Sequence, residues 1–273
     1  MANTVINPVV DLDWLRAHAG DVVLADVRWY LDGRSGRAAY QEGHLPGAVF
    51  IDLDTALAGP ASPAEGRHPL PDPKVFAAAM SAAGIGDAAT VVAYDDAGGV
   101  IAARLVWLLR AIGREAALLD GGLLSYDGEL TTETPVPPPA VFSPREWPSE
   151  RLASLVDTTE GGHLVLDARD AFRFRGDSEP VDARPGHIPG ARNLPCRENV
   201  AEGGRFLPVA ELRERFAAVG VTGDAEVISY CGSGVTACHN LIAMEHAGLG
   251  QGRLYPGSWS QYSHTDRPAA TGD

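Results

Sequence analysis

One set of landmarks occurs twice, in the same order, in this chain of 273 residues, and the repeat limits the folds that the chain can adopt. An Asp-x-Arg triplet follows an apolar run at residues 26–28 and again at residues 167–169. A Gly-His-x-Pro-Gly-Ala segment comes next, at residues 43–48 and 186–191. Its histidine lies 18 residues after the first aspartate and 20 residues after the second. This agreement in order and spacing indicates a duplicated structural unit.

The later part of the repeat keeps a constant offset. Val-Val-Ala-Tyr at residues 91–94 matches Val-Ile-Ser-Tyr at residues 227–230, which lies 136 residues further along the chain. A glycine and a tyrosine downstream keep the same offset. The landmarks together predict two copies of a domain of about 130 residues each.

Apolar strands alternate with helical patterns in each copy. In the first copy we expect strands at residues 22–27, 49–52, 90–94 and 117–119, and helices at residues 11–18, 37–42, 73–83 and 100–112. Such alternation predicts an α/β fold in which each domain is a parallel sheet flanked by helices.

A proline-rich stretch at residues 128–148 separates the copies and is typical of a semi-rigid connector. We place the boundary near residue 140, between domains at residues 1–140 and 141–273.

Composition and charge exclude several classes of partner and compartment. The net charge of −14 argues against nucleic acid or an anionic membrane as the main partner. Three cysteines without framework spacing do not suggest a disulfide-built secreted protein, and residues 1–13 show no secretory leader. No apolar run approaches the roughly 20 residues that span a bilayer. We therefore expect a cytoplasmic protein.

The strongest chemical signal is a cysteine at a junction between a strand and a helix. Cys231 follows the apolar strand expected at residues 227–230, and a helical pattern begins at residue 237. Two glycines in the intervening loop allow its N–H groups to converge, and the helix adds its positive end. Such a site favours the thiolate, which is the reactive form of cysteine. The alternative, a merely buried cysteine, does not account for the glycines.

The matching position in the first copy is Asp95, which cannot act as a sulfur nucleophile. The sequence therefore predicts that only the second domain is catalytic and that the first is catalytically silent.

Three other interpretations of the cysteine loop are weaker. Gly-Ser-Gly-Val-Thr-Ala at residues 232–237 fits a dinucleotide pattern, but no acidic residue closes the next strand, expected at residues 253–255. A phosphatase of the Cys-x5-Arg type needs arginine at position 237, which is alanine. Cys231, Cys238 and His239 lack the spacing of zinc ligands. We therefore expect neither a metal nor a cofactor.

These segments resemble the tandem rhodanese family of sulfurtransferases over nearly the whole chain. The Cys-Gly-Ser-Gly-Val-Thr loop is similar to that of the members that use 3-mercaptopyruvate, whereas thiosulfate-using members carry Cys-Arg-Lys-Gly-Val-Thr. Tyr94-Asp95 resembles the silent first domain, and the paired Gly-His segments and Pro-Gly-Ser-Trp at residues 256–259 also match.

The resemblance implies a two-step transfer of sulfur. The Cys231 thiolate takes a sulfur atom from a small-molecule donor and becomes a persulfide. An acceptor thiol, such as thioredoxin or glutathione, or cyanide in an assay, then removes it. Two alternatives stay open: a thiosulfate:cyanide sulfurtransferase, and a persulfide carrier or redox sensor without fast turnover.

The resemblance also assigns roles to individual residues. Ser233 is expected to relay a proton, and His44 and Asp32 of the first domain are expected to complete that relay. A structural role for His44 stays open, because His187 occupies the same motif in the second copy.

Substrate binding is assigned to two arginines and to the loop. The first arginine of Arg-Phe-Arg-Gly, Arg173, is expected to hold the donor carboxylate, and Arg184 is the nearest candidate for a second arginine. The loop residues expected to contact the donor are Gly232, Gly234, Val235 and Thr236.

Overall fold

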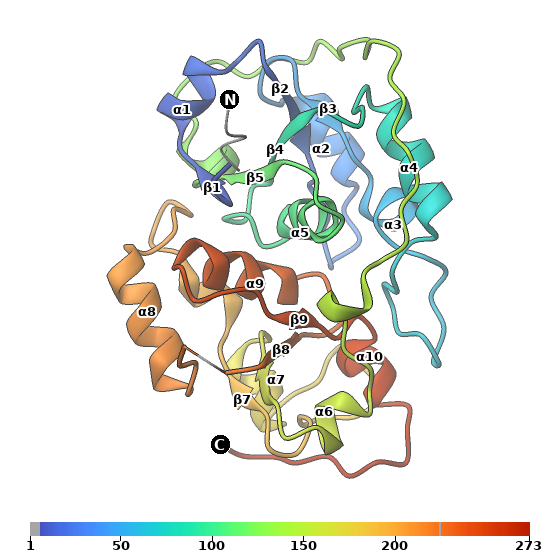
Figure 1. Cartoon of the computed structure of the whole chain (residues 1–273), viewed down its shortest axis with the longest axis vertical. Helices are drawn as coiled ribbons and strands as arrows, with labels where there is room; N and C mark the ends of the chain where they lie inside the picture. Colours follow the sequence, from blue (N-terminus) through green and yellow to red (C-terminus); the bar gives the residue numbers. More distant parts are fainter. Residues whose placement is uncertain (1–5, 224) are drawn as a thin grey trace. The chain divides into compact units, whose positions relative to one another are not determined.

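Two all-parallel sheets, one from each copy of the repeat, form the framework of this protein (Figure 1). The computed structural model describes residues 6–223 and 225–273. The first five residues of the stretch in which we expect no leader therefore lie outside the described part. The chain divides into unit 1, made of Met1–Ala58, Pro71–Trp147 and Ala201–Phe206, and unit 2, made of Gly59–Leu70, Pro148–Val200 and Leu207–Asp273.

The sheet of unit 1 has the strand order β1-β5-β4-β2-β3. Its strands are β1 (Val9–Val10), β2 (Val22–Asp26), β3 (Val49–Phe50), β4 (Thr90–Tyr94) and β5 (Ala116–Leu119). The helices of this unit are α1 (Leu12–Ala17), α2 (Gly36–Glu42), α3 (Leu53–Ala56), α4 (Pro73–Ala82) and α5 (Ala103–Ala111), with a 3-10 turn at Gly122–Ser125. Edge strand β1 is the one element of this sheet that the sequence pattern did not predict.

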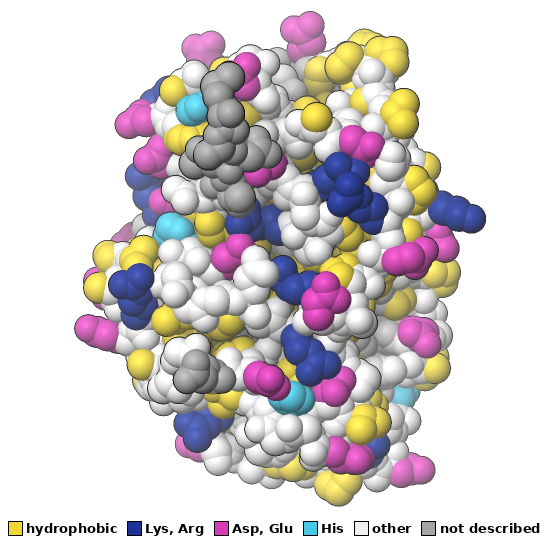
Figure 2. All heavy atoms as spheres, in the orientation of Figure 1, with side chains coloured by type: hydrophobic (Ala, Val, Ile, Leu, Met, Phe, Trp, Pro, Cys, Tyr) yellow, Lys and Arg dark blue, Asp and Glu magenta, His cyan; other side chains and the backbone are white. Residues whose placement is uncertain are grey.

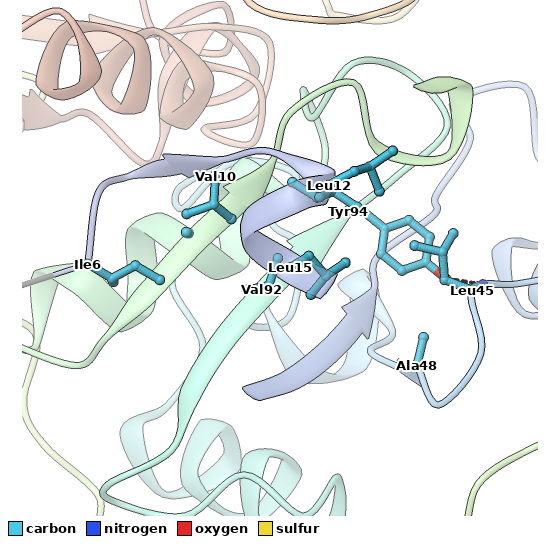
Figure 3. Close-up of a cluster of buried hydrophobic side chains, with 10 residues drawn as sticks. Ile6, Val10, Leu12, Leu15, Leu45, Ala48, Val92 and Tyr94 are labelled. Atoms are coloured by element: carbon cyan, nitrogen blue, oxygen red, sulfur yellow. Dashed lines mark hydrogen bonds between the residues drawn. The ribbon is translucent and has the colours of Figure 1, made fainter. Parts of the chain in front are cut away.

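The core of unit 1 shows how the sheet face is filled. Val92 and Tyr94 of β4 pack with Leu12 and Leu15 of α1 in a buried cluster (Figure 3). Successive side chains of a strand point to opposite faces, so the intervening β4 residues face the other way, where α5 lies against β4 and β5. Helices therefore cover both faces, which is why the strands read as continuous apolar runs.

The sheet of unit 2 has the strand order β7-β6-β8-β9. Its strands are β6 (Leu164–Asp167), β7 (Arg192–Asn193), β8 (Val227–Tyr230) and β9 (Arg253–Leu254). The helices are α6 (Asp157–Glu160), α7 (Ala171–Arg175), α8 (Val209–Ala218), α9 (Ala237–His246) and α10 (Ser258–Tyr262), with 3-10 turns at Ser149–Arg151 and Cys196–Asn199.

The repeated landmarks form the same set of contacts in both units. In unit 1, Arg28 Nη2 lies 2.8 Å from Asp26 Oδ2 and 2.7 Å from the carbonyl oxygen of Gly43. In unit 2, Arg169 Nη2 lies 2.7 Å from both Asp167 Oδ2 and the carbonyl oxygen of Gly186. The buried ion pair thus holds the start of the Gly-His-x-Pro-Gly turn beside the strand end.

A tyrosine fixes the same turn from the next strand. The Tyr94 hydroxyl accepts a hydrogen bond from the Leu45 N–H at 3.0 Å (Figure 3), and the Tyr230 hydroxyl accepts one from Ile188 at 3.2 Å. The three landmarks therefore have similar sequence spacing in both copies because they contact one another in the folded unit.

The boundaries of the two units differ from a single division of the chain near residue 140. That point lies within the proline-rich connector, which stays with unit 1, and Pro148 begins the next stretch of unit 2. The segment Gly59–Leu70, from the first half of the sequence, belongs to unit 2. The Arg67 N–H donates to Ser260 Oγ at 2.9 Å, which anchors this segment to α10.

Acidic and basic side chains are interspersed on the face that Figure 2 shows, in keeping with a chain that has 36 acidic and 22 basic residues. Among the described residues, no helix is both long and apolar enough to cross a membrane.

Candidate active site

Cys231 lies at the carboxyl end of β8, an interior strand of the unit 2 sheet. Only 2% of its surface is exposed, and its Sγ atom accepts a hydrogen bond from the Gly234 N–H at 3.1 Å. Gly234 has a φ of +77°, and a Cβ atom there would lie 2.6 Å from the Pro256 carbonyl oxygen. This position therefore requires glycine, and the glycine brings an N–H group to the sulfur.

The loop is held in place by the start of α10. The Trp259 and Ser260 N–H groups donate to the carbonyl oxygens of Cys231 and Gly232 at 3.0 and 2.8 Å. In a trans peptide the N–H points away from the carbonyl oxygen, so the following loop N–H groups are directed away from α10. Ser258 accepts a hydrogen bond from the Cys231 N–H at 3.1 Å. It is the one non-glycine with positive φ, 52°, within the described residues. This uncommon backbone conformation places the Ser258 hydroxyl within hydrogen-bond distance of the Cys231 N–H.

The matching loop of unit 1 shows what such a loop encloses. The fully buried Asp95 carboxylate accepts four backbone hydrogen bonds of 2.7–2.9 Å, which are donated by Ala97, Gly99, Ile101 and Ala102. Burial raises the pKa of Asp95, although the four N–H donors oppose that shift. In unit 1 the chain thus supplies its own carboxyl group to the loop, whereas unit 2 presents the Cys231 sulfur at the matching position.

The Ser233 hydroxyl has a histidine partner that the sequence analysis missed. Ser233 Oγ lies 2.7 Å from His68 Nδ1, and the two residues are 6% and 5% exposed. His68 lies on the Gly59–Leu70 segment of unit 2, outside the repeated landmarks. No local pattern marks this histidine, because its role depends on where that segment packs.

His44 and Asp32, which we expected beside Ser233, have other surroundings in unit 1. The two ring nitrogens of His44 lie 2.8 Å from the Tyr40 carbonyl oxygen and 3.2 Å from that of Glu133. Its ring stacks on Tyr40, and the corresponding His187 of unit 2 stacks on Phe174 in the same way. Within unit 2 the histidine at Ser233 is His68, and in both units the Gly-His motif braces a turn. The relay expected for His44 stays a prediction.

Asp32 is exposed, and its carboxylate accepts hydrogen bonds from the backbone and side chain of Arg34. These two bonds lower the pKa of Asp32. Its described contacts are those of a local surface turn and do not join it to Ser233.

Two guanidinium groups face the catalytic loop at Gly232. A Cβ atom on Gly232 would lie 3.0 Å from Arg67 Nη2 and 3.6 Å from Arg173 Nη1. Arg173, for which the sequence predicts substrate binding, is one of these two groups. The second cation is Arg67, again from the Gly59–Leu70 segment, which the sequence analysis did not identify.

Arg184, the expected second arginine, has a different environment. Its Nη2 atom donates to the Arg267 carbonyl oxygen at 2.6 Å, and its guanidinium lies about 6 Å from the rings of Trp259 and Tyr262. These contacts tie the C-terminal stretch to α10. The structure therefore assigns Arg184 a packing role and gives the place beside Gly232 to Arg67.

The remaining loop residues and cysteines complete the site. Val235 is buried, and Val235 and Thr236 lead into α9 by accepting hydrogen bonds from Cys238 and His239. Burial, together with the neighbouring Cys231, raises the pKa of Cys196 to about 12, which keeps that thiol protonated. Within residues 6–223 and 225–273, no group of three or more histidine, cysteine or acidic side chains is placed to hold a metal ion.

Comparison with known proteins identifies the family and several relatives of this chain. Residues 11–129 and 150–265 each match the rhodanese-like domain. The chain is 42% identical over 268 residues to the "Probable 3-mercaptopyruvate sulfurtransferase" of Pseudomonas aeruginosa, covering 93% of each chain. It is 40% identical over 265 residues to the "Putative thiosulfate sulfurtransferase SseB" of Mycobacterium tuberculosis, again covering 93% of each.

A solved structure has the same fold. The 3-mercaptopyruvate sulfurtransferase from Leishmania major superposes with a TM-score of 0.84 at 31% identity, covering 95% of this chain and 75% of that one.

Proposed function

The chain belongs to the tandem rhodanese family of sulfurtransferases, and on that premise we propose that it moves a sulfur atom from 3-mercaptopyruvate, through a persulfide on Cys231, to an acceptor thiol. The observation that carries this proposal is the Cys231 loop. Its sulfur accepts an N–H hydrogen bond at 3.1 Å, and the loop contains no cation of its own. The cations lie beside the loop, at Arg67 and Arg173, where the far end of a donor would be held.

In the first step the Cys231 thiolate attacks the thiol sulfur of mercaptopyruvate. A sulfur–sulfur bond forms, the carbon–sulfur bond breaks, and the electron pair leaves with carbon as the enolate of pyruvate. A proton then converts the enolate to pyruvate. The enzyme keeps the sulfur as Cys231–S–SH, a covalent intermediate of nucleophilic catalysis.

In the second step an acceptor thiolate attacks the outer sulfur of the persulfide. The bond to Cys231 breaks, the acceptor leaves as its own persulfide, and Cys231 returns to the thiolate. Cyanide in place of the thiol would leave as thiocyanate.

The remaining side chains support these steps. A guanidinium grips a planar carboxylate at two points, so Arg173 and Arg67 suit the carboxylate of mercaptopyruvate. The buried Ser233–His68 pair, with 2.7 Å between oxygen and nitrogen, is suited to deliver a proton to the enolate.

The proposal is tested by comparing two donors with one acceptor. With cyanide as the acceptor, we expect kcat/KM for 3-mercaptopyruvate to exceed that for thiosulfate by at least about tenfold, the scale of one charge-assisted hydrogen bond. Release of pyruvate and thiocyanate provides the two readouts.

The outcomes separate the alternatives. A higher kcat/KM for thiosulfate would contradict the choice of donor and would favour a thiosulfate sulfurtransferase. Formation of one persulfide without steady-state turnover would favour a carrier or sensor instead.

Replacing His68 with glutamine should slow turnover. The variant loses the imidazole at Ser233, so we expect kcat to fall by about 10²-fold or more, within the range for a lost general acid, with a smaller change in KM. His163→Gln is the matched control, because His163 belongs to the same unit and its ring nitrogen lies 2.9 Å from Glu226, at the opposite end of β8 from Cys231. Unchanged kcat in a folded His68→Gln variant would remove His68 from the mechanism.

A further inference from the structure

Six charged side chains of unit 2 form a line of alternating sign that ends beside the catalytic loop. Arg169 pairs with Asp167 at 2.7 Å and with Glu179 at 3.2 Å. Glu179 pairs with Arg173 at 2.6 Å, and Arg173 pairs with Asp182 at 2.9 Å. Asp182 then pairs with Arg67 at 2.6 Å, which ends the line. The three carboxylates formally cancel the three guanidinium charges.

Asp182 binds both of the arginines that face Gly232. It holds Arg67 by Nη1 and Arg173 by Nη2, and the atoms nearest a Cβ position on Gly232 are Arg67 Nη2 and Arg173 Nη1. Each guanidinium therefore has one end on Asp182 and the other toward the loop. The Asp182 carboxylate itself lies 3.7 Å from that Cβ position.

The Asp182 carboxylate and its two arginine partners are largely shielded from solvent. The side chains of Asp182, Arg173 and Arg67 are 2%, 11% and 26% exposed, so their charges are only partly screened by water. Glu179, the other carboxylate on Arg173, is equally buried. Burial alone would raise the pKa of Glu179, but hydrogen bonds from Arg173 and two backbone N–H groups lower it, so it stays ionised.

The same residues have an approach from solvent. Arg67 and Asp182 line a hollow of about 460 Å³ together with Gly66, Ser260 and His264. The Nε atom of Arg67 is buried and lacks a hydrogen-bond partner among the described residues.

We propose that Asp182 determines the charge of the donor that this site accepts, by neutralising one of the two guanidinium charges beside Gly232. The inference rests on the proposed sulfur transfer from mercaptopyruvate. A donor with one carboxylate can be held by the loop-facing ends of Arg67 and Arg173, while Asp182 holds their other ends. A dianion such as thiosulfate needs two uncompensated cations and would bring its second charge toward the Asp182 carboxylate.

A purely structural role for Asp182 makes a different prediction. If the carboxylate only holds its segment in place, its loss should lower kcat/KM for every donor by a similar factor. A role in selectivity instead changes the ratio between donors.

The main experiment measures that ratio in Asp182→Asn. We expect kcat/KM for thiosulfate relative to 3-mercaptopyruvate to rise by at least about tenfold, because Arg67 loses the carboxylate that pairs with it. Asp177→Asn is the matched control in the same segment, since Asp177 is exposed and pairs with Arg175. Asp182→Glu keeps the charge and should keep the ratio near the original value. A ratio within about twofold of the unmodified enzyme in folded Asp182→Asn, or an equal rise in Asp177→Asn, would overturn the proposal.

A second measurement needs neither turnover nor a folded variant. In the unmodified protein, acetate should protect Cys231 from alkylation by iodoacetamide at a lower concentration than sulfate does. Stronger protection by sulfate would overturn the inference about Asp182. Absence of mercaptopyruvate turnover would instead overturn the proposed function. The relative protection by acetate and sulfate would still test the inference about Asp182.

Discussion

Cys231→Ser should abolish sulfur transfer. The serine hydroxyl stays protonated at neutral pH and cannot form a persulfide, so the covalent intermediate is lost entirely. We expect no measurable turnover with either donor and no added sulfur atom by mass spectrometry of the intact protein. The fold should change little, because the substitution is nearly isosteric at a position that is 2% exposed.

The other cysteines provide the control. Cys196 is buried with a pKa of about 12, so Cys196→Ser should leave persulfide formation intact. Robust turnover in Cys231→Ser, or loss of the persulfide in Cys196→Ser alone, would mean that the nucleophile has been assigned to the wrong sulfur.

Asp95→Asn should destabilise unit 1 strongly, because the Asp95 side chain is fully buried among backbone donors. Its two carboxylate oxygens accept four backbone hydrogen bonds, and asparagine replaces one oxygen with an N–H₂ group that faces two of those donors. Each unsatisfied buried donor costs about 1–3 kcal/mol, so we expect a loss of roughly 3 kcal/mol in the free energy of unfolding of this unit.

Hydrogen exchange is the suitable measurement, because it resolves the two units separately. Protection should fall in β4 and α5 of unit 1 and stay the same in the unit 2 sheet. Asp21→Asn, at an exposed aspartate of unit 1, is the control. Equal protection in Asp95→Asn and Asp21→Asn would show that the loop tolerates an uncharged side chain.

Much of the fold was predictable because it depends on local patterns. The expected strands at residues 90–94 and 227–230 match β4 and β8, and the helical pattern after the cysteine loop matches α9. Apolar runs and glycines act over a few residues, so a sequence shows them directly. The same reasoning placed Cys231 at the end of a strand and Asp95 at the matching strand end of unit 1.

The repeat was readable, but its meaning required coordinates. The spacing of the Asp-x-Arg triplet, the Gly-His segment and the tyrosine showed two copies. Only the structure showed that these residues bond to one another and that His44 and His187 both brace a turn.

The neighbours of Cys231 were decided by tertiary structure alone. His68 and Arg67 lie more than 160 residues before Ser233 and Gly232 in the sequence, on a segment that leaves its own half of the chain and packs in unit 2. No local pattern encodes such a placement, because it depends on the packing of Gly66 and Arg67 against Gly257 and Ser260. The sequence by itself thus determined the position of Cys231 and its loop, and the long-range packing of one short segment determined which histidine and which second arginine lie beside that loop.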